Sequence, residues 1–318
     1  MSDLSKLSVQ EIRERFINQG KPISSHLLKR MQKDSRRGVR SIYQILKKQK
    51  GDEREEQLRL DSMLNFERVL WKSGVTHIAG VDEAGVGPLA GPVVAAAVIF
   101  PPNTQIGGVD DSKRLDAVTR DRLALEIRRK ATSIGIGLAE VAEIDQINIY
   151  HAALLAMKRA VENLPVRPEH VLVDAREVPH LPIPQNMFFK GDGINFSIAA
   201  ASIIAKTHRD QVMETLHCEY PQYGFRRHKG YSTQEHQLAI QQHGPSPVHR
   251  RSYMFIEELC GQYSDLFYSL QEKLNRIDSV AGLKSFELEL EEVSASLDSR
   301  EQRKLNLMVT RRWKVAAA

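Results

Sequence analysis

The stretch VDEAGVGPLAGP, residues Val81–Pro92, decides both the fold and the chemistry that the rest of the chain must support. It follows the short apolar run Ile78–Gly80, places two carboxylates side by side, and continues with three glycines and two prolines. Chains that only need to fold seldom end a buried strand in an acidic pair and a glycine-rich loop. Three interpretations are open: a phosphate loop for a dinucleotide, a metal site, or a tight turn.

The spacing of the glycines argues against the dinucleotide site. A dinucleotide-binding fingerprint reads G-x-G-x-x-G and opens a helix. Here Gly85–Gly91 reads G-x-G-x-x-x-G and leads into the extended apolar run Val93–Phe100. The chain also contains no G-x-x-x-x-G-K-[ST] phosphate loop. We therefore expect the glycines to let backbone N–H groups approach a substrate phosphate or hydroxyl closely.

Strand and helix signals along the chain predict an α/β fold. Apolar, β-branched runs bounded by Gly and Pro predict strands, which lie at residues 78–81, 93–100, 133–142, 170–175 and 187–192. Helical periodicity follows at residues 148–164, and a longer helix is expected at Phe196–Glu219, ended by Pro221. Three strands followed by strands that alternate with helices predict a mixed sheet flanked by helices.

Acidic residues stand where these strands end. Asp82 and Glu83 close the first strand, Asp174 closes a later one, and Asp192 closes the next. Functional groups gather at strand ends in α/β sheets, and converging carboxylates repel one another unless cations neutralise them. Oxygen-rich sites of this kind suit Mg²⁺ or Mn²⁺, although a single Asp there is more often a cap or turn residue.

Adjacent side chains on a strand point to opposite faces. Glu83 can therefore share a metal with Asp82 only if the chain turns there, which Gly85 and Gly87 permit. Two cations about 3.5–4 Å apart can hold the attacking and leaving oxygens of a phosphodiester. The sequence thus predicts a two-metal site at the carboxyl ends of the strands.

Composition places the chain among ordinary globular proteins. It has 318 residues, of which 42% are hydrophobic. No run approaches the ~18 uninterrupted apolar residues of a membrane helix, and the N-terminus lacks the apolar core of a signal peptide. Cys218 and Cys260 are too few for a disulfide scaffold and form no C-x-x-C zinc pattern. We expect a cytoplasmic protein with no membrane segment.

Positive charge is concentrated near the N-terminus. Residues 1–60 carry 15 Lys and Arg against 8 Asp and Glu, whereas the remainder carries 30 against 32. We expect residues 1–60 to form a basic helical extension that begins with a capping box at Ser8–Glu11. Residues 66–262 would form the α/β domain, and residues 263–318 a helical C-terminal appendage of unknown role. The basic excess favours a polyanionic partner, although a solvated helical surface explains it equally well.

Seven motifs, in order, resemble a known family. They are AGVDEAGVGPLAGPVVAAAV, VDDSKRL, VLVDA, KGD, SIAAASIIAKTHRD, YGFRRHKGY and HGPSPVHRRS. Together they resemble type 2 ribonuclease H (bacterial ribonuclease HII) over about residues 66–255, and DSRRGVRSIYQILKKQK resembles the N-terminal extension of some members. The resemblance implies a ribonuclease H-like fold and a metal-dependent endonuclease, so that residues 66–262 would be a ribonuclease H-like catalytic domain.

The resemblance also implies the reaction. The family cuts the RNA strand of RNA–DNA hybrids and cuts on the 5′ side of ribonucleotides embedded in duplex DNA. It uses Mg²⁺ or Mn²⁺, two ions per active site during catalysis, and leaves 3′-hydroxyl and 5′-phosphate ends. By this resemblance the metal-binding catalytic acids are the four already reached from the strand ends: Asp82, Glu83, Asp174 and Asp192.

The family's Gly-Arg-Gly loop reads the 2′-hydroxyl and the following DNA junction, largely through backbone groups. The matching substrate-binding residues are Gly85, Val86, Gly87 and Pro88. Val86 replaces the family's arginine, so backbone contacts survive but a guanidinium contact does not. We expect hybrid cleavage to persist in weakened form.

Further substrate contacts follow from the same resemblance. Tyr231 matches the tyrosine that stacks on the deoxyribose beside the ribonucleotide, and a capping box at Ser232–Glu235 would place it just before a helix. Other substrate-binding candidates are Lys113, Ser202 and Lys206. Weaker candidates for contact with the nucleic-acid backbone are Arg226, Arg227, Lys229, Arg250 and Arg251. For each of these a solvated surface role is equally open.

Two other functions stay open. A hybrid-binding protein of the same fold with weakened turnover is favoured only by Val86, and four intact acids argue against it. Another two-metal nuclease is also possible, but the Gly-x-Gly loop and Tyr231 indicate ribonucleotide selection. The expected partners are RNA–DNA hybrid and ribonucleotide-containing duplex DNA. No protein partner is implied, and we expect a monomer.

Overall fold

The computed structural model describes residues 4–260 and 263–316. The chain divides into two compact units, each described here by itself. The first comprises Met1–Ala84, Val94–Leu138 and Ala153–His208. The second comprises Gly85–Val93, Ala139–Ala152 and Arg209–Ala318.

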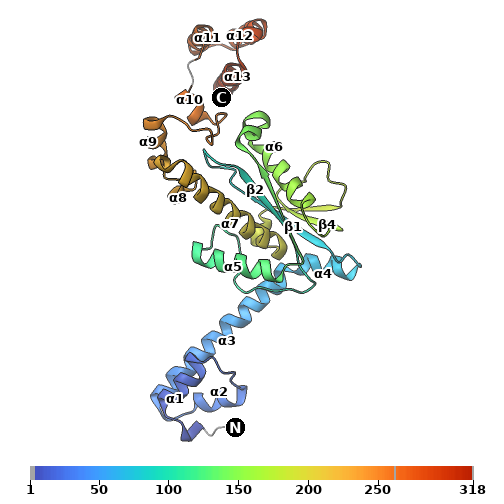
Figure 1. The fold of residues 1–318 in the computed structure, drawn as a ribbon, viewed down its shortest axis with the longest axis vertical. Helices are drawn as coiled ribbons and strands as arrows, with labels where there is room; N and C mark the ends of the chain where they lie inside the picture. The colour runs from blue at the N-terminus through green and yellow to red at the C-terminus, as the bar shows by residue number, and fades with distance from the viewer. Residues whose placement is uncertain (1–3, 261–262, 317–318) are drawn as a thin grey trace. The chain divides into compact units, whose positions relative to one another are not determined.

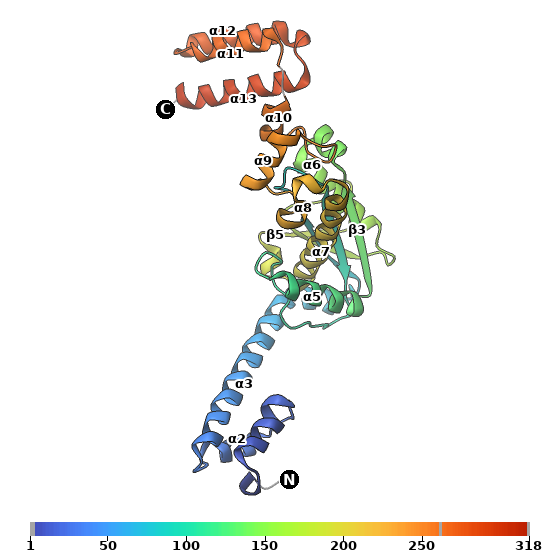
Figure 2. The same ribbon diagram turned by 60° about the vertical axis from the view of Figure 1, so that its left-hand side comes forward.

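The first unit is built on a five-stranded mixed sheet with the order β3-β2-β1-β4-β5. Figure 1 labels β1, β2 and β4, and Figure 2 labels β3 and β5. β1 pairs antiparallel with β2 and parallel with β4, and β4 pairs parallel with β5. The strands are β1 (Ile78–Ala84), β2 (Val93–Ile99), β3 (Ser133–Ala139), β4 (His170–Asp174) and β5 (Gln185–Phe188). The predicted α/β fold with a mixed sheet, of the ribonuclease H-like kind, is confirmed.

Helices cover both faces of this sheet because its residues alternate in direction. Ile134 and Ile136 of β3 face the cluster that contains α5 (Ala117–Lys130) and α7 (Phe196–Glu219). The intervening Gly135 and Gly137 face α6 (Val141–Glu162), so closely that an added Cβ would stand 2.0–2.1 Å from carbonyl oxygens of α6. The two glycines therefore let this helix pack directly against the strand.

The long helix α7 has the predicted bounds, Phe196–Glu219. The helix predicted from residue 148 begins earlier, at Val141, but is broken at Asn148, whose φ is 66°. The Asn148 carboxamide accepts hydrogen bonds from the N–H groups of Tyr150 and His151. The predicted start thus corresponds to a new N-cap inside α6.

The first helices of the chain form a small core of their own, which ends at Leu46. They are α1 (Val9–Arg13), a π-helical turn (Glu14–Asn18), α2 (Ser25–Gln32) and the first part of α3 (Arg37–Met63), preceded by a 3₁₀ turn (Leu4–Lys6). The next helix, α4 (Asn65–Lys72), packs on the sheet instead. The predicted capping box at Ser8 and Glu11 is confirmed by both of its hydrogen bonds. The boundary expected at residue 60 falls inside α3, because Leu60 and Met63 join the core on the sheet.

The second unit contains the remaining helices: α8 (Phe225–His228), α9 (Gln234–His243), α10 (Met254–Cys260), α11 (Asp265–Asn275), α12 (Val280–Val293) and α13 (Ser299–Ala316). Short 3₁₀ turns lie at Pro221–Tyr223 and Ser294–Ser296. Helices α11, α12 and α13 lie side by side around buried residues such as Phe267, Phe286 and Leu305 (Figure 2). The boundary expected at residue 262 lies outside the described residues.

The capping box predicted at Ser232–Glu235 is wrong. The N-cap of α9 is Thr233, whose hydroxyl accepts from the N–H of His236. Glu235 instead pairs with Arg227. None of the described helices is long and apolar enough to cross a membrane.

Candidate active site

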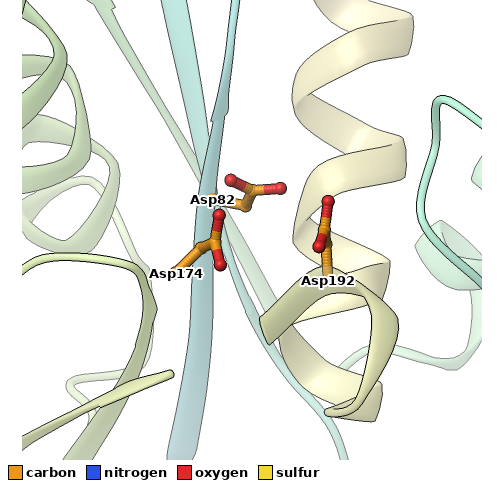
Figure 3. A group of neighbouring side chains, drawn as sticks. All are labelled: Asp82, Asp174 and Asp192. Atoms are coloured by element: carbon orange, nitrogen blue, oxygen red, sulfur yellow. The ribbon is translucent and has the colours of Figure 1, made fainter. Parts of the chain in front are cut away.

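Three aspartates converge at one end of the sheet (Figure 3). Each of Asp82, Asp174 and Asp192 offers an oxygen that lies within 4.8 Å of the corresponding oxygens of the other two. Asp82 and Asp192 are buried, and Asp174 is partly buried. They come from positions separated by up to 110 residues in the chain, so the fold alone brings them together.

Strand register places the first two carboxylates. Val81 of β1 is paired with Val173 of β4, so Asp82 and Asp174 come next on neighbouring parallel strands. Gly80, two residues before Asp82, lies on the same face of β1. An added Cβ at Gly80 would stand 2.1 Å from the carbonyl carbon of Ser197, so α7 packs directly on the strand there. This packing brings Ser202 of α7 into electrostatic contact with Asp82.

Asp192 reaches the site from a turn and not from a strand end as predicted. β5 ends at Phe188, and Asp192 lies in the 3₁₀ turn Gly191–Gly193. The chain reverses at Lys190, which has a φ of 56°, and the Gly191 N–H donates to Asp174 Oδ1 at 2.7 Å. The turn therefore holds Asp174 while presenting Asp192.

A buried glutamate anchors the helix that follows this turn. Glu67 of α4 accepts hydrogen bonds from the Asn195 amide at 3.0 Å and the Ser197 hydroxyl at 2.8 Å. Asn195 in turn accepts from the Ile198 N–H at 3.1 Å. Burial raises the pKa of Glu67, although its hydrogen bonds oppose the shift. The hydrogen bonds of Glu67 therefore fix the start of α7 and, with it, the turn that carries Asp192.

Burial and like charge make the acidic group costly without a cation. Burial, followed by the negative charges of Glu83 and Asp174, raises the pKa of Asp82 well above its ordinary value. Burial is also the largest cause of the raised pKa of Asp174, with Asp192 adding to it. Asp82 Oδ2 is buried and has no hydrogen-bond partner among the described residues. This orphaned oxygen and the oxygen-only donor set fit a hard divalent cation such as Mg²⁺ or Mn²⁺.

Lys113 is the basic side chain that the structure places at this site. Its Nζ lies 3.2 Å from Asp192 Oδ2 and 3.9 Å from Asp111 Oδ1, and 75% of the side chain is exposed. Burial is the largest influence on its pKa and lowers it, but the neighbouring carboxylates outweigh burial and leave the pKa raised. The single positive charge of this ammonium group cannot neutralise the carboxylates around it. The remaining negative charge favours the binding of divalent cations.

Glu83 lies beside the three aspartates but outside the group of mutually close oxygens. β1 continues in register with β2 through Ala84, so the chain does not turn at Glu83. Its pKa is raised by burial and then by the charge of Asp174, which places the carboxylate within the same electrostatic site. Its predicted role as a metal ligand stays a prediction.

The glycine-rich loop after β1 belongs to the second unit, where buried arginines hold it. Gly85 has a φ of 98°, and an added Cβ there would lie 2.1 Å from Arg209 Nε. Arg209 also donates to the carbonyls of Pro92 and Ala90, each at 3.2 Å. Only glycine fits this position, because the backbone is left-handed and any side chain would collide with the Arg209 guanidinium. Val86, next in the loop, is 38% exposed.

Tyr231 lies against the same loop. An added Cβ at Gly87 would be 3.7 Å from Tyr231 Cε1, and the Leu89 N–H donates to the Gly230 carbonyl at 2.8 Å. The guanidinium of Arg209 lies over the tyrosine ring at 5.9 Å from its centre. Because Tyr231 is 44% exposed, a substantial part of its surface is open to a ligand.

The basic residues predicted to contact the nucleic-acid backbone do not form one class. Arg226 and Lys229 pair with Glu214, Arg227 pairs with Glu235, and Arg251 is exposed. Arg250 corrects the prediction: it is completely buried and donates to the carbonyls of Gly85, Val86 and Gly91. It cannot reach a phosphate without leaving that site.

Several buried or half-buried polar residues carry no clear signal in the sequence. Ser112 is buried with its hydroxyl oxygen 2.8 Å from that of Ser202, so the predicted Ser202 is part of a buried pair. Lys206 is half-buried four residues further along α7. Arg209 and His236 are structurally important residues that the sequence does not predict. The one sequence signal for Arg209 is its place directly before an acid in the motif THRD.

The electrostatics of the site predict that Asp174→Asn stabilises the metal-free protein. A carboxylate whose pKa is raised on folding stabilises the fold below its unfolded pKa, and this stability is lost as pH rises through the folded pKa. At pH 7 the ionised Asp174 is therefore destabilising, and its replacement should raise the melting temperature of the metal-free protein. Thermal unfolding with a chelator present measures this. Added Mn²⁺ should reverse the order, because binding stabilises the wild type more.

Asp121→Asn is the matched control, since it makes the same change at an exposed aspartate of α5. It should leave both melting temperatures unchanged. A metal-free Asp174→Asn protein that melts below the wild type would contradict the electrostatic account.

Comparisons with known proteins agree with this geometry. The family model described as Ribonuclease HII matches residues 79–256, and the model of the Ribonuclease HII N-terminal domain matches residues 8–71. The chain is 47% identical over 262 residues to the ribonuclease HII of Myxococcus xanthus (strain DK1622), covering 82% of this chain and 89% of that protein. It is 45% identical over 258 residues to the ribonuclease HII of Desulfitobacterium hafniense (strain DSM 10664 / DCB-2), covering 81% and 98%.

Among solved structures, the ribonuclease H2 of Pyrococcus horikoshii OT3 is 25% identical with a TM-score of 0.49, covering 57% of this chain and 96% of that one. The family match spans more than half of the chain and includes the sheet, Asp82, Asp174 and Asp192. The protein is therefore a member of the ribonuclease HII family, the type 2 ribonucleases H, which are metal-dependent hydrolases that cut the RNA strand of RNA–DNA hybrids.

Proposed function

We propose that this enzyme also cuts duplex DNA on the 5′ side of embedded ribonucleotides, leaving 3′-hydroxyl and 5′-phosphate ends, and that it uses two Mg²⁺ or Mn²⁺ ions. The observation that carries the proposal is the convergence of Asp82, Asp174 and Asp192 within 4.8 Å at the ends of β1 and β4 and the turn before α7. A group of buried, mutually repelling carboxylates is costly to a fold and is typical of a cation site.

The residues that would hold the ions are the three aspartates, with Glu83 beside them. When bound, a pair of divalent cations supplies activation of a water molecule and neutralisation of the charge on the leaving oxygen. Asp82 would contribute the oxygen that has no hydrogen-bond partner in the described part of the chain. Asp174 keeps one oxygen on the Gly191 N–H, which fixes the direction of the other.

Lys113 has a separate role in this proposal. Its ammonium group lies 3.2 Å from Asp192 and is mostly exposed, so it can contact a phosphate while holding that carboxylate in place. An ammonium group is a compact point charge that positions a phosphate without reading sequence. Ser202, whose hydroxyl oxygen lies 2.8 Å from that of Ser112, interacts with Asp82 and would limit its movement.

Selection of the ribonucleotide would depend on the loop Gly85–Pro88 and on Tyr231. A 2′-hydroxyl distinguishes RNA from DNA and offers both a donor and an acceptor. Glycine backbone in the loop allows close approach to that hydroxyl. The exposed face of Tyr231, beside Gly87, offers an apolar surface for the adjacent sugar that lacks the hydroxyl.

The function is tested with duplex DNA that carries one ribonucleotide, an all-RNA strand paired with DNA, and all-DNA duplex. We expect metal-dependent cleavage of the first two and none of the third. Asp174→Asn should lower kcat by more than the roughly 10–100-fold that loss of an outer ligand partner costs, while Asp121→Asn should not change it. Undiminished cleavage by Asp174→Asn, or cleavage of all-DNA duplex, would contradict the proposed function.

Val86 favours a second candidate, a protein that binds hybrids but turns them over weakly. The loop lacks the guanidinium that the family places at this position, and Val86 is exposed where that group would act. We expect Val86→Arg to raise kcat/KM on the single-ribonucleotide duplex by about 10-fold or more, the effect of one charge-assisted hydrogen bond. Val86→Lys, which carries the charge without the fork, should gain less. No gain from either variant would show that the loop works through its backbone alone.

The N-terminal helices are proposed to add affinity through charge. Residues 1–50 carry 13 Lys and Arg against 4 Asp and Glu, and their core from Leu4 to Leu46 lies wholly within that range. Each phosphate neutralised makes affinity more dependent on salt. Removing residues 1–50 should therefore flatten the slope of log Kd against log salt.

Removing residues 264–318 is the matched control for that deletion. These C-terminal residues carry 9 Lys and Arg against 9 Asp and Glu, so their loss should leave the salt slope unchanged. Equal slopes for the full chain and for the protein without residues 1–50 would reject a phosphate-binding role for the N-terminal helices.

A further inference from the structure

We propose that the dipeptide His249-Arg250 is a positioning unit: it fixes the backbone of Gly85–Gly91 and the backbone of Tyr231 relative to each other and thereby sets selectivity for a ribonucleotide. The inference rests on the proposed function of the loop and of Tyr231. Neither residue would touch the substrate, because both are completely buried. All of the residues involved belong to the second unit.

The dipeptide is part of a short extended segment that pairs with the loop. Ala90 and His249 form an antiparallel bridge. The Arg250 N–H donates to the Leu89 carbonyl, and the Gly91 N–H donates to the Val248 carbonyl, each at 2.8 Å. Successive side chains of an extended segment point in opposite directions. Arg250 therefore faces the loop, and His249 faces the helix that follows Tyr231.

Every N–H group of the Arg250 side chain donates a hydrogen bond to the loop or to Tyr253. A guanidinium has five N–H groups in a fixed fork. Nε donates to the Gly91 carbonyl at 2.9 Å, and Nη2 donates to the carbonyls of Gly85 and Gly91 at 2.6 and 2.8 Å. Nη1 donates to the Val86 carbonyl at 3.0 Å and to the Tyr253 hydroxyl at 2.8 Å.

Three loop carbonyls are thus turned toward one buried cation. The Tyr253 hydroxyl adds a second donor to the Val86 carbonyl at 2.6 Å. A peptide unit whose carbonyl is held in this way cannot rotate, so the direction of its N–H is fixed as well. At Val86 the side chain offers no polar group, and the orientation of the backbone is what remains for recognition.

His249 reaches Tyr231 through a second histidine, and the hydrogen bonds fix every proton on the way. The Ser246 N–H donates to His249 Nδ1 at 2.9 Å, so that nitrogen is the acceptor and Nε2 carries the proton. His249 Nε2 then donates to His236 Nε2 at 3.0 Å. His236 Nδ1 consequently carries a proton and donates to the Tyr231 carbonyl at 2.9 Å.

This relay requires both imidazoles to be neutral, and their surroundings keep them so. Burial lowers the pKa of His236 to about 4 and that of His249 to about 3. The rings are also confined by aromatic neighbours: His249 contacts Tyr223 with ring centres 4.7 Å apart, and His236 stacks on His228 at 4.4 Å. Buried polar networks are costly unless every member is satisfied, and when satisfied they specify one geometry.

The test measures binding selectivity with the full chain in Ca²⁺, as the ratio of Kd for all-DNA duplex to Kd for the same duplex carrying one ribonucleotide. His249→Phe keeps the ring packing and removes the relay, whereas His249→Gln keeps a donor and an acceptor. Arg250→Lys keeps the charge and loses the fork. We expect His249→Phe and Arg250→Lys to lower the ratio about 10-fold, as loss of a buried hydrogen bond would, and His249→Gln to stay within about 3-fold of the wild type.

A double-mutant cycle with Tyr231→Ala separates positioning from general stability. If His249 acts through Tyr231, His249→Phe should lower the ratio no further once the tyrosine ring is gone. Arg159→Lys is the matched control for Arg250→Lys, since Arg159 also donates to a backbone carbonyl, that of Leu138 at 2.7 Å, but lies in the other unit. It should leave the ratio unchanged.

The possible results separate the inference from the function on which it rests. A wild-type ratio of one, without cleavage at the ribonucleotide, would refute the proposed function. A wild-type ratio well above one that persists in folded His249→Phe and Arg250→Lys would overturn the positioning role, as would additive losses in the cycle. Thermal unfolding identifies the folded variants, and should Arg250→Lys not fold, the two His249 variants decide alone.

Discussion

Repulsion among carboxylates held at the end of a rigid sheet is the constraint on which the rest of the structure depends. Parallel pairing of β1 with β4 sets Asp82 beside Asp174, and neither strand can shift without breaking the register of a buried sheet. The repulsion among the carboxylates is confined to this one site. Direct packing of α7 on Gly80 holds the strand that carries Asp82. A cation relieves the repulsion, so binding and folding of this region are linked.

The two units solve different physical problems with opposite charges. In the first, acids are buried close together and lack sufficient positive charge, which makes a site for cations. In the second, Arg209 and Arg250 are buried beneath a glycine loop and donate to its carbonyls. Burial lowers the pKa of Arg209 to about 10, so it remains charged at neutral pH. The acidic group and the glycine-rich loop therefore depend on separate polar networks.

Much of this arrangement could be predicted from local sequence patterns. β-Branched runs and small residues predicted the strands and the bounds of α7, and strand-end acids predicted the meeting of Asp82 with Asp174. Asp192 lies beside Asp82 and Asp174, but it comes from a turn and not from the predicted strand end, because the left-handed turn at Lys190 has no sequence signal in a non-glycine residue.

Arg250 shows the limit of reasoning from composition. Arginine is almost never fully buried unless it is paired. A cluster of basic residues in a sequence therefore predicts exposed side chains. Its partners here are carbonyls about 160 positions earlier in the chain, at Gly85 and Gly91. No local pattern encodes that contact, since every peptide carries a carbonyl. The same holds for His236, whose role depends on a bond to His249 that only the folded chain creates.

The proposed recognition through the loop backbone would give these costly buried groups a function. The difference between RNA and DNA is a single hydroxyl, and a flexible side chain loses conformational entropy when it binds one. A loop whose carbonyls are already fixed by Arg250 has lost this conformational entropy during folding and does not lose it again on binding. If the proposed function holds, a chain with valine at position 86 would depend on this preorganisation more than one that carries a second cation there. Rigidity beneath the loop, rather than charge upon it, would then be the property that selects the substrate.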